Sequence, residues 1–191
     1  MCGIGLAIGP HPDRAATFAA PYIAARGPHQ HGVLIDRSIL IRGDGPLPTG
    51  DPLLAILAVA HRTVLLHSRL ATSTYAIRPA DAQPLRNGRA ILAHNGVVPG
   101  WRPTPESTVD SAAILDALAA GATLTEALTR TGVLDVPHAV IAYSPADAAW
   151  TAHRNRLPLY ASIVDDTLIV SSRIPGGTPL PEHEPVTLEA P

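Results

Sequence analysis

The sequence predicts an α+β protein built as a sandwich of sheets and helices. Short apolar runs typical of strands alternate along the chain with Ala- and Leu-rich stretches that carry helix start and stop residues. Hydrophobic residues make up 46% of the 191 residues and charged residues 16%, so the chain has enough apolar surface for a sizeable core. We expect one domain over residues 1–191, with a Pro-rich tail from about residue 175.

The first elements are a strand, a helix and a pair of strands. Ile4–Ile8 is an apolar run that suits a buried strand. The Ala-rich stretch Asp13–Ala25 predicts a helix, which Gly27 and the proline after it stop. Val33–Asp36 and Ile39–Arg42 predict two paired strands.

A short helix and two further strands follow. Asp51 as the N-cap, with Pro52 at the first helical position, predicts a helix that ends near His61. Thr63–Leu66 and Arg89–Ala93 predict strands that each end in a polar triplet. The triplets are His67-Ser68-Arg69 and His94-Asn95-Gly96. Because functional residues concentrate where strands give way to loops, both triplets are candidate site segments.

Two helices come next in the predicted order. Ser107 with Asp110 three residues later resembles a capping box and predicts a helix that runs to Ala119. Leu124–Arg130 predicts a second helix, closed by Gly132.

The last third predicts a series of antiparallel strands. Asp165-Asp166 is a turn signal between the last two strands of the series, and Pro185–Leu188 predicts one weak strand in the tail. The strands of the series are Ala139–Tyr143, Ala149–Arg154, Leu159–Ile163 and Leu168–Ser171.

Composition excludes several kinds of chemistry. The 14 cationic residues are all arginines, so the chain has no lysine for a phosphate-binding P-loop or a Schiff base. The arginines are scattered and the net charge is −2, which does not support a surface for nucleic acid.

Cysteine usage and hydropathy indicate the compartment. A single cysteine rules out an internal disulfide and fits a reducing compartment. The longest apolar run, Leu53 to Ala60, is far shorter than a membrane span, and the first ten residues lack the features of a secretory signal. We therefore expect a cytoplasmic protein with no membrane partner.

The only cysteine is residue 2, where removal of Met1 would leave a cysteine with a free α-amine. A nucleophile and a base would then share one residue. The ordinary pKa values of the thiol, about 8.5, and of the amine, about 7.7 to 8.0, differ by less than a unit, so proton transfer between them is inexpensive. A small buried side chain at position 2 is the alternative reading of Cys2 alone.

The segments behind Cys2 decide between these readings. The segments are Met1-Cys2-Gly3-Ile4, Arg26-Gly27-Pro28, His67-Ser68-Arg69-Leu70-Ala71-Thr72, Gln83-Pro84-Leu85 and His94-Asn95-Gly96-Val97. Taken in order with Asp110 downstream, they resemble the class II, N-terminal-nucleophile (Ntn) glutamine amidotransferases, the glutaminase domains of asparagine synthetase, glucosamine-6-phosphate synthase and their relatives. The resemblance extends to about Arg173.

The resemblance implies catalytic roles for three residues. Cys2 would attack the glutamine side-chain amide, with its own α-amine as the base. Asn95 and Gly96 would donate hydrogen bonds to the oxyanion that forms, a contribution that is typically large. A hairpin turn is the structural alternative for this Asn-Gly pair.

It also implies substrate-binding roles. Arg69 would bind the α-carboxylate of glutamine as a bidentate guanidinium, Asp110 would receive the α-ammonium group, and Thr72 would add a polar contact. Arg26 would position the site. The resemblance implies no metal and no cofactor.

The sequence departs from the family pattern at two positions. His29 follows the Arg-Gly-Pro segment where members similar to asparagine synthetase have Asp, and Ser73 stands where sugar-phosphate amidotransferases have His.

His29 and His31 have metal-ligand spacing, but no carboxylate or thiol nearby completes a ligand set, so a solvated loop is favoured.

The fold implied by the resemblance is a four-layer α/β/β/α Ntn-hydrolase sandwich with two antiparallel sheets. The implied reaction is hydrolysis of L-glutamine through a γ-glutamyl thioester on Cys2, with ammonia supplied to a separate synthetase partner. Two alternatives stay open: an Ntn hydrolase of another γ-glutamyl or small linear amide, and a non-catalytic regulatory subunit.

Overall fold

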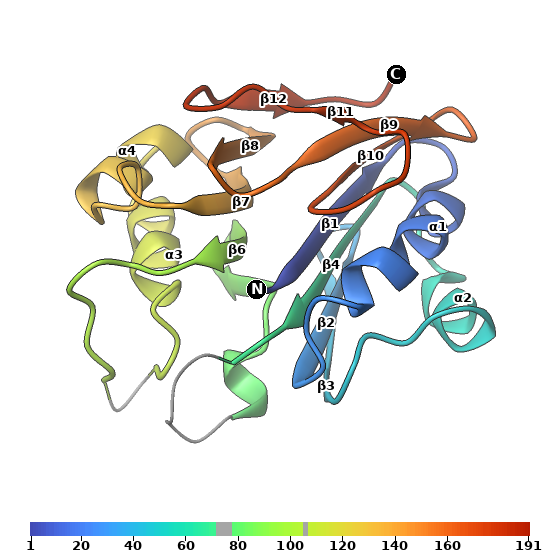
Figure 1. The fold of residues 1–191 in the computed structure, drawn as a ribbon, viewed down its shortest axis with the longest axis horizontal. Coiled ribbons are helices and arrows are strands. Elements are labelled where there is room, and N and C mark those ends of the chain that lie inside the picture. Colours follow the sequence, from blue (N-terminus) through green and yellow to red (C-terminus); the bar gives the residue numbers. More distant parts are fainter. Residues whose placement is uncertain (72–77, 105–106) are drawn as a thin grey trace.

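The computed structural model describes residues 1–71, 78–104 and 107–191 (Figure 1). Within these residues the strands are β1 (Gly3–Ile8), β2 (Gln30–Ile35), β3 (Ile39–Asp44), β4 (Thr63–Arg69), β5 (Leu85–Asn87), β6 (Ala90–Gly96), β7 (His138–Ser144), β8 (Ala149–Asn155), β9 (Tyr160–Val164), β10 (Thr167–Ser171), β11 (Thr178–Pro179) and β12 (Val186–Leu188). The helices are α1 (Pro12–Ala24), α2 (Asp51–Leu57), α3 (Ala112–Ala119) and α4 (Leu124–Arg130), with a 3-10 turn at Pro79–Asp81.

Two antiparallel sheets pack face to face between helices (Figure 1). In the described part, one sheet has seven strands in the order β11-β9-β10-β1-β4-β2-β3, and the other has five in the order β12-β8-β7-β6-β5. Helices α1 and α2 cover the outer face of the larger sheet, and α3 and α4 cover that of the smaller one. The predicted α/β/β/α sandwich is confirmed.

Three hydrophobic clusters hold the four layers together. The central one joins inward side chains of the two sheets, such as Leu6 and Leu65 from the larger and Ile141 from the smaller. The outer clusters join each sheet to its helices. Alternate residues of β1 and β4 enter different clusters, as expected for strands buried on both faces.

Helix α1 packs unusually close to the start of β1. A Cβ atom on Gly3 would lie 2.3 Å from the carbonyl oxygen of Ile23, and one on Gly5 would lie 2.5 Å from the Ile23 Cδ1 atom. Because the obstacle at position 3 is backbone, only glycine fits there, and the close packing fixes the strand that begins directly after Cys2.

Most predicted elements are confirmed with small shifts at their ends. The predicted bounds of α4 agree with the structure, and Asp165 and Asp166 form the two-residue turn between β9 and β10, both with positive φ. Strands β4 and β6 are longer than predicted, so the two polar triplets lie inside strands, because ladder pairing continues through them.

Three expectations are wrong in detail. The N-cap residue of α2 is Gly50 rather than Asp51, and the helix ends at Leu57 rather than near His61. Helix α3 begins at Ala112 without a capping box, because the Asp110 carboxylate accepts a hydrogen bond from the Val98 N–H instead. The four late strands do not form one series: β7 and β8 join the smaller sheet, while β9 and β10 join the larger one.

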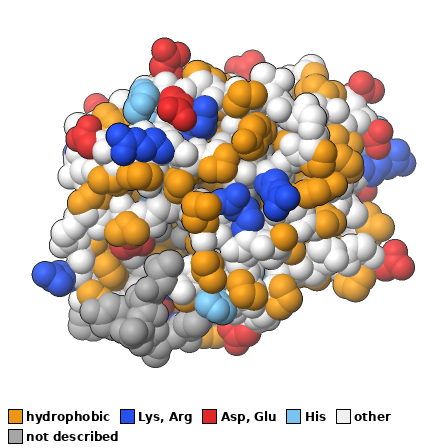
Figure 2. Space-filling view, viewed as in Figure 1, with side chains coloured by type: hydrophobic (Ala, Val, Ile, Leu, Met, Phe, Trp, Pro, Cys, Tyr) orange, Lys and Arg blue, Asp and Glu red, His pale blue; other side chains and the backbone are white. Residues whose placement is uncertain are grey.

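The surface carries mixed charge. On the face shown in Figure 2, cationic and anionic side chains are spread among apolar ones, and no large patch of one sign forms there. Among the described residues, no helix is both long and apolar enough to cross a membrane.

Candidate active site

One cavity gathers most of the predicted site residues. It has a volume of about 350 Å³ and lies where β1, β4 and β6 begin or end at one end of the sandwich. Cys2, Arg69, Asn95, Gly96 and Asp110 all line it. Three segments far apart in the sequence meet here because β4 pairs with β1 in the larger sheet and β6 lies opposite them in the smaller one.

Cys2 is half-buried and lines this cavity. Its backbone N–H donates a hydrogen bond of 3.1 Å to the Asn95 Oδ1 atom, and its Sγ lies 3.8 Å from the Leu70 carbonyl oxygen. Burial raises the pKa of the thiol. Met1, directly before Cys2, has 57% of its surface exposed.

Arg26 lies beside Cys2 without lining the cavity. Its Nε donates a hydrogen bond of 3.1 Å to the Cys2 carbonyl oxygen, and its Nη2 lies 3.6 Å from the Met1 sulfur. The side chain comes from the segment directly after α1, so the helix that packs on β1 also anchors the residue in front of β1.

The side-chain amide of Asn95 has a hydrogen-bond partner at its oxygen but none at its nitrogen among the described residues. Its Oδ1 accepts from Cys2, while its buried Nδ2 has no hydrogen-bond partner among the described residues. An unpaired buried amide donor beside a cavity is a costly arrangement, and such groups are often reserved for a ligand.

Gly96 follows with φ 151°, a value that favours glycine. A Cβ atom here would lie 2.6 Å from the His94 Nε2 atom and 3.0 Å from the Pro137 carbonyl oxygen. Both backbone angle and space therefore require glycine at the end of β6.

Arg69 is buried, with 8% of its surface exposed. Its Nη1 donates to the Gln30 Oε1 atom at 2.7 Å, and the Gln30 Nε2 atom donates in turn to the Asp44 carboxylate at 3.2 Å. Gln30 faces Arg69 directly across the β2–β4 ladder. No sequence pattern points to Gln30, because only the strand register shows which residue meets Arg69.

Asp110 faces the same cavity from the loop before α3. Its Oδ2 accepts a hydrogen bond of 2.7 Å from the Val98 N–H, and its Oδ1 accepts one of 3.4 Å from Ser111. The carboxylate thus ties the loop after β6 to the start of α3. Arg69 and Asp110 place opposite charges in one cavity. Thr72, the remaining predicted binding residue, lies outside the described residues.

Gln83 is a second residue that the sequence analysis did not assign. Its side-chain Oε1 accepts from the His94 N–H at 2.6 Å, and its Nε2 donates to the His94 carbonyl oxygen at 3.2 Å and to Ser111 at 3.3 Å. This amide pairs with the backbone just before Asn95 as a neighbouring strand would. The Gln-Pro-Leu motif was the available signal for it.

The two histidines of the triplets are buried and neutral. His67 and His94 expose 0% and 1% of their surfaces, and burial lowers the pKa of each to about 3. The rings of His29 and His31 both contact backbone atoms. The His29 Nδ1 atom accepts a hydrogen bond of 2.9 Å from the Ala71 N–H, and the His31 Nδ1 atom lies 3.2 Å from the Gly45 carbonyl oxygen. No cluster of metal-ligating side chains forms in the described part of the chain.

Comparison with known proteins gives structural relatives. No protein-family model and no curated protein matches the sequence. Among solved structures, the chain is similar to glutamine phosphoribosylpyrophosphate amidotransferase from B. subtilis complexed with ADP and GMP, with a TM-score of 0.58 and 17% identity over 98% of this chain. It is also similar to a structure described as the allosteric regulatory enzyme of purine biosynthesis, with a TM-score of 0.60, 18% identity and the same coverage.

The chain spans about half the length of these two structures, since the match covers 45% of each. At 17% and 18% identity, the likeness concerns the fold. The chain has the two-sheet sandwich fold found in a glutamine amidotransferase.

Proposed function

We propose that the protein is a glutaminase of the glutamine amidotransferase type that uses Cys2 as its nucleophile. The observation that carries the proposal is the meeting of Cys2, Asn95, Gly96, Arg69 and Asp110 around one cavity of about 350 Å³. The fold shared with a glutamine amidotransferase supports it as an analogy.

Removal of Met1 would turn the Cys2 backbone nitrogen into an α-amine that stays within hydrogen-bond distance of Asn95. As a neutral base this amine takes the thiol proton, while Sγ attacks the side-chain carbonyl carbon of glutamine. The proton then passes to the leaving nitrogen, and ammonia departs. A γ-glutamyl thioester remains on Cys2. Water attacks this thioester with the amine again as base, which releases L-glutamate and the thiol.

Two donors are suited to the oxyanion of both steps. The Asn95 Nδ2 is buried and has no partner in the described part of the chain, so it is free to donate. The Gly96 N–H lies next to it at the end of β6. Donors that are already in place stabilise developing charge without reorganisation, and the loss of one typically costs roughly 100- to 1000-fold in rate.

Arg69 and Asp110 fit the head group of a free α-amino acid. The Arg69 guanidinium, held by Gln30, suits the α-carboxylate. The Asp110 carboxylate suits the α-ammonium group. Residues 1–191 would on this proposal form a single amidotransferase domain, and Thr72 would add a contact.

The same proposal includes the fate of ammonia. We infer that a separate synthetase-type chain accepts it, by analogy with an amidotransferase that carries both parts. Affinity capture of this protein from its native cells should recover an enzyme that consumes ammonia, and its absence under conditions that preserve weak complexes would contradict this part.

The decisive experiment compares glutamate release from glutamine by tag-free protein, Cys2→Ala and Cys2→Ser. All three side chains at position 2 are small enough for Met1 removal, which intact mass verifies. We expect glutamate only from the native protein, because alanine has no nucleophile and serine has a far less acidic one.

Correctly processed native protein that releases no glutamate would contradict the proposal. A panel of γ-glutamyl conjugates and small linear amides would then test the Ntn hydrolase alternative. No turnover of any amide would favour a non-catalytic regulatory role.

A further inference from the structure

A second cavity lies at the opposite end of the sandwich from Cys2. Strand β1 begins beside Cys2 and ends at Ile8, which lines this second cavity about 20 Å away along the strand. Its volume is about 850 Å³, compared with about 350 Å³ for the Cys2 cavity. Both volumes lie within the range of about 300 to 1,000 Å³ typical of small-molecule sites. We call it the distal cavity.

One wall of the distal cavity is aromatic and carries a cation. The rings of Tyr143 and Trp150 pack edge to face with centroids 5.7 Å apart. The Arg37 guanidinium lies 4.3 Å from the centroid of the Tyr143 ring. Such cation–π contact orients the guanidinium while leaving its N–H groups available.

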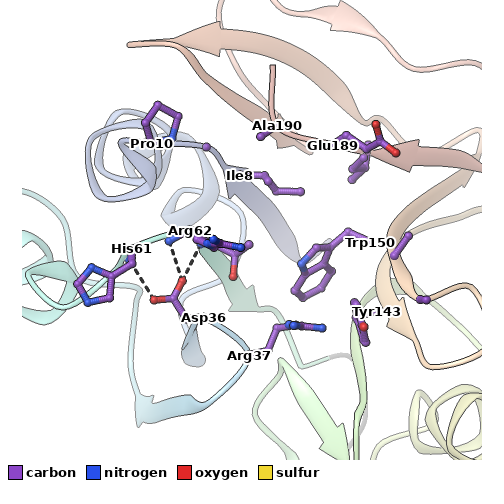
Figure 3. Close-up of a pocket in the computed structure, with 15 residues that line it drawn as sticks. Ile8, Pro10, Asp36, Arg37, His61, Arg62, Tyr143, Trp150, Glu189 and Ala190 are labelled. Atoms are coloured by element: carbon purple, nitrogen blue, oxygen red, sulfur yellow. Dashed lines mark hydrogen bonds between the residues drawn. The ribbon is translucent and has the colours of Figure 1, made fainter.

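Three donors come to this space from different elements (Figure 3). Arg37 comes from the turn between β2 and β3, Arg62 from the segment before β4, and Trp150 from β8. The Trp150 indole nitrogen is turned toward the side where Arg62 lies. Within the described residues, neither arginine forms an ion pair.

The nearest carboxylate is already engaged by backbone. Asp36 accepts hydrogen bonds of 2.9, 2.8 and 2.8 Å from the N–H groups of residues 61, 62 and 63 (Figure 3). Glu189, at the other side of the cavity, is exposed and makes no ion pair among the described residues. The two carboxylates of the lining balance the formal charges of Arg37 and Arg62. Because backbone N–H groups engage the Asp36 oxygen atoms, the guanidinium N–H groups stay available to an anion.

Arg37 lies in a turn with an unfavourable backbone conformation. Asp36 and Arg37 have φ values of 48° and 60°, a conformation that is unfavourable for non-glycine residues. The three hydrogen bonds of Asp36 compensate for it and link this turn to the segment that carries Arg62.

We propose that the distal cavity binds a small organic anion with a flat aromatic body. The anionic group lies between the guanidinium groups of Arg37 and Arg62, which suit planar or tetrahedral oxyanions. The aromatic body packs against Trp150 and the apolar side chains of Ile8 and Leu188. This site is separate from the Cys2 cavity and does not depend on the proposed glutaminase activity.

The two tryptophans give a direct test, because Trp101 lines the Cys2 cavity and Trp150 the distal one. In Trp101→Phe, all tryptophan fluorescence comes from Trp150. We expect a saturable change in this emission on titration with phenyl phosphate or benzoate, and these two probes show which anionic group is preferred. Inorganic phosphate should compete at least about tenfold more weakly, because it lacks the ring.

Arg37→Ala and Arg62→Ala in the Trp101→Phe background should each weaken binding by about tenfold or more. Arg130→Ala, an exposed arginine at the end of α4, is the matched control and should bind normally. Circular dichroism verifies that every variant is folded. The proposal is overturned if neither aromatic anion gives a saturable change, if inorganic phosphate competes equally, or if the two arginine variants bind as the control does.

Discussion

Replacement of His67 by leucine tests whether buried histidines make this fold sensitive to acid. His67 is completely buried in β4, and both of its ring nitrogens lack a hydrogen-bond partner among the described residues. Burial lowers its pKa from 6.5 to about 3, and burial lowers that of His94 to the same value. Both side chains are therefore neutral in the folded protein at any pH above about 4.

The sign of the effect follows from proton binding. Between the folded pKa of about 3 and the unfolded value of 6.5, the unfolded chain binds more protons than the folded one. Stability is therefore fully present above the unfolded pKa and decreases as the pH falls below it. From pH 7 to pH 5, each such histidine removes about 2 kcal/mol. His67 and His94 together remove about 4 kcal/mol, a large share of the 5–15 kcal/mol typical of a domain.

The measurement is urea unfolding of the native protein and of His67→Leu at pH 7 and pH 5. Leucine has a similar volume and no unpaired polar atom, so the two proteins should differ little at pH 7. Between pH 7 and pH 5 the native protein should lose about 2 kcal/mol more than His67→Leu. His11→Gln, which removes an exposed histidine, should lose as much as the native protein. Equal losses in native protein and His67→Leu would refute the reasoning.

Three further predictions concern the site and one helix. Asn95→Ala should lower kcat for glutamine by roughly 100- to 1000-fold with little change in KM, because Nδ2 would act only in the transition state; a change confined to KM would contradict this role. Arg69→Lys should raise KM more than it lowers kcat, since lysine loses both the bidentate contact and the hydrogen bond to Gln30; unchanged steady-state kinetics would argue against it. Thr123→Ala should reduce the free energy of unfolding by about 1 kcal/mol, because it removes the capping box of α4 formed with Glu126; thermal unfolding that matches native protein would count against this value.

Local pattern predicted the type of every α-helix and of every strand except β5 and β11. Helix α4 was predicted residue for residue, because its start and stop signals lie within a few residues of its ends. The predicted start of helix α3 is wrong because of a contact with a residue outside the helix. Asp110 has the spacing of a capping residue, but its carboxylate accepts a hydrogen bond from the Val98 N–H in the loop after β6. The alternation pattern of β8 and β9 also did not reveal that the chain changes sheets between them.

The identities of the site residues came from a few segments that resemble a known family, and their catalytic roles remain proposals. The partners that hold them came only from three-dimensional packing. Gln30 reaches Arg69 through strand register, and Gln83 pairs with the backbone of His94 across elements distant in sequence. No spacing along the chain encodes either contact.

The sequence by itself determined an N-terminal cysteine candidate, a lysine-free chain and the succession of strands and helices, because each is a property of composition or of neighbouring residues. Only the tertiary structure decided which strands share a sheet, how Cys2 and Asn95 meet, and that Arg37, Arg62 and Trp150 surround a second cavity. These features depend on contacts between residues far apart in the chain, which form only when the two sheets pack together.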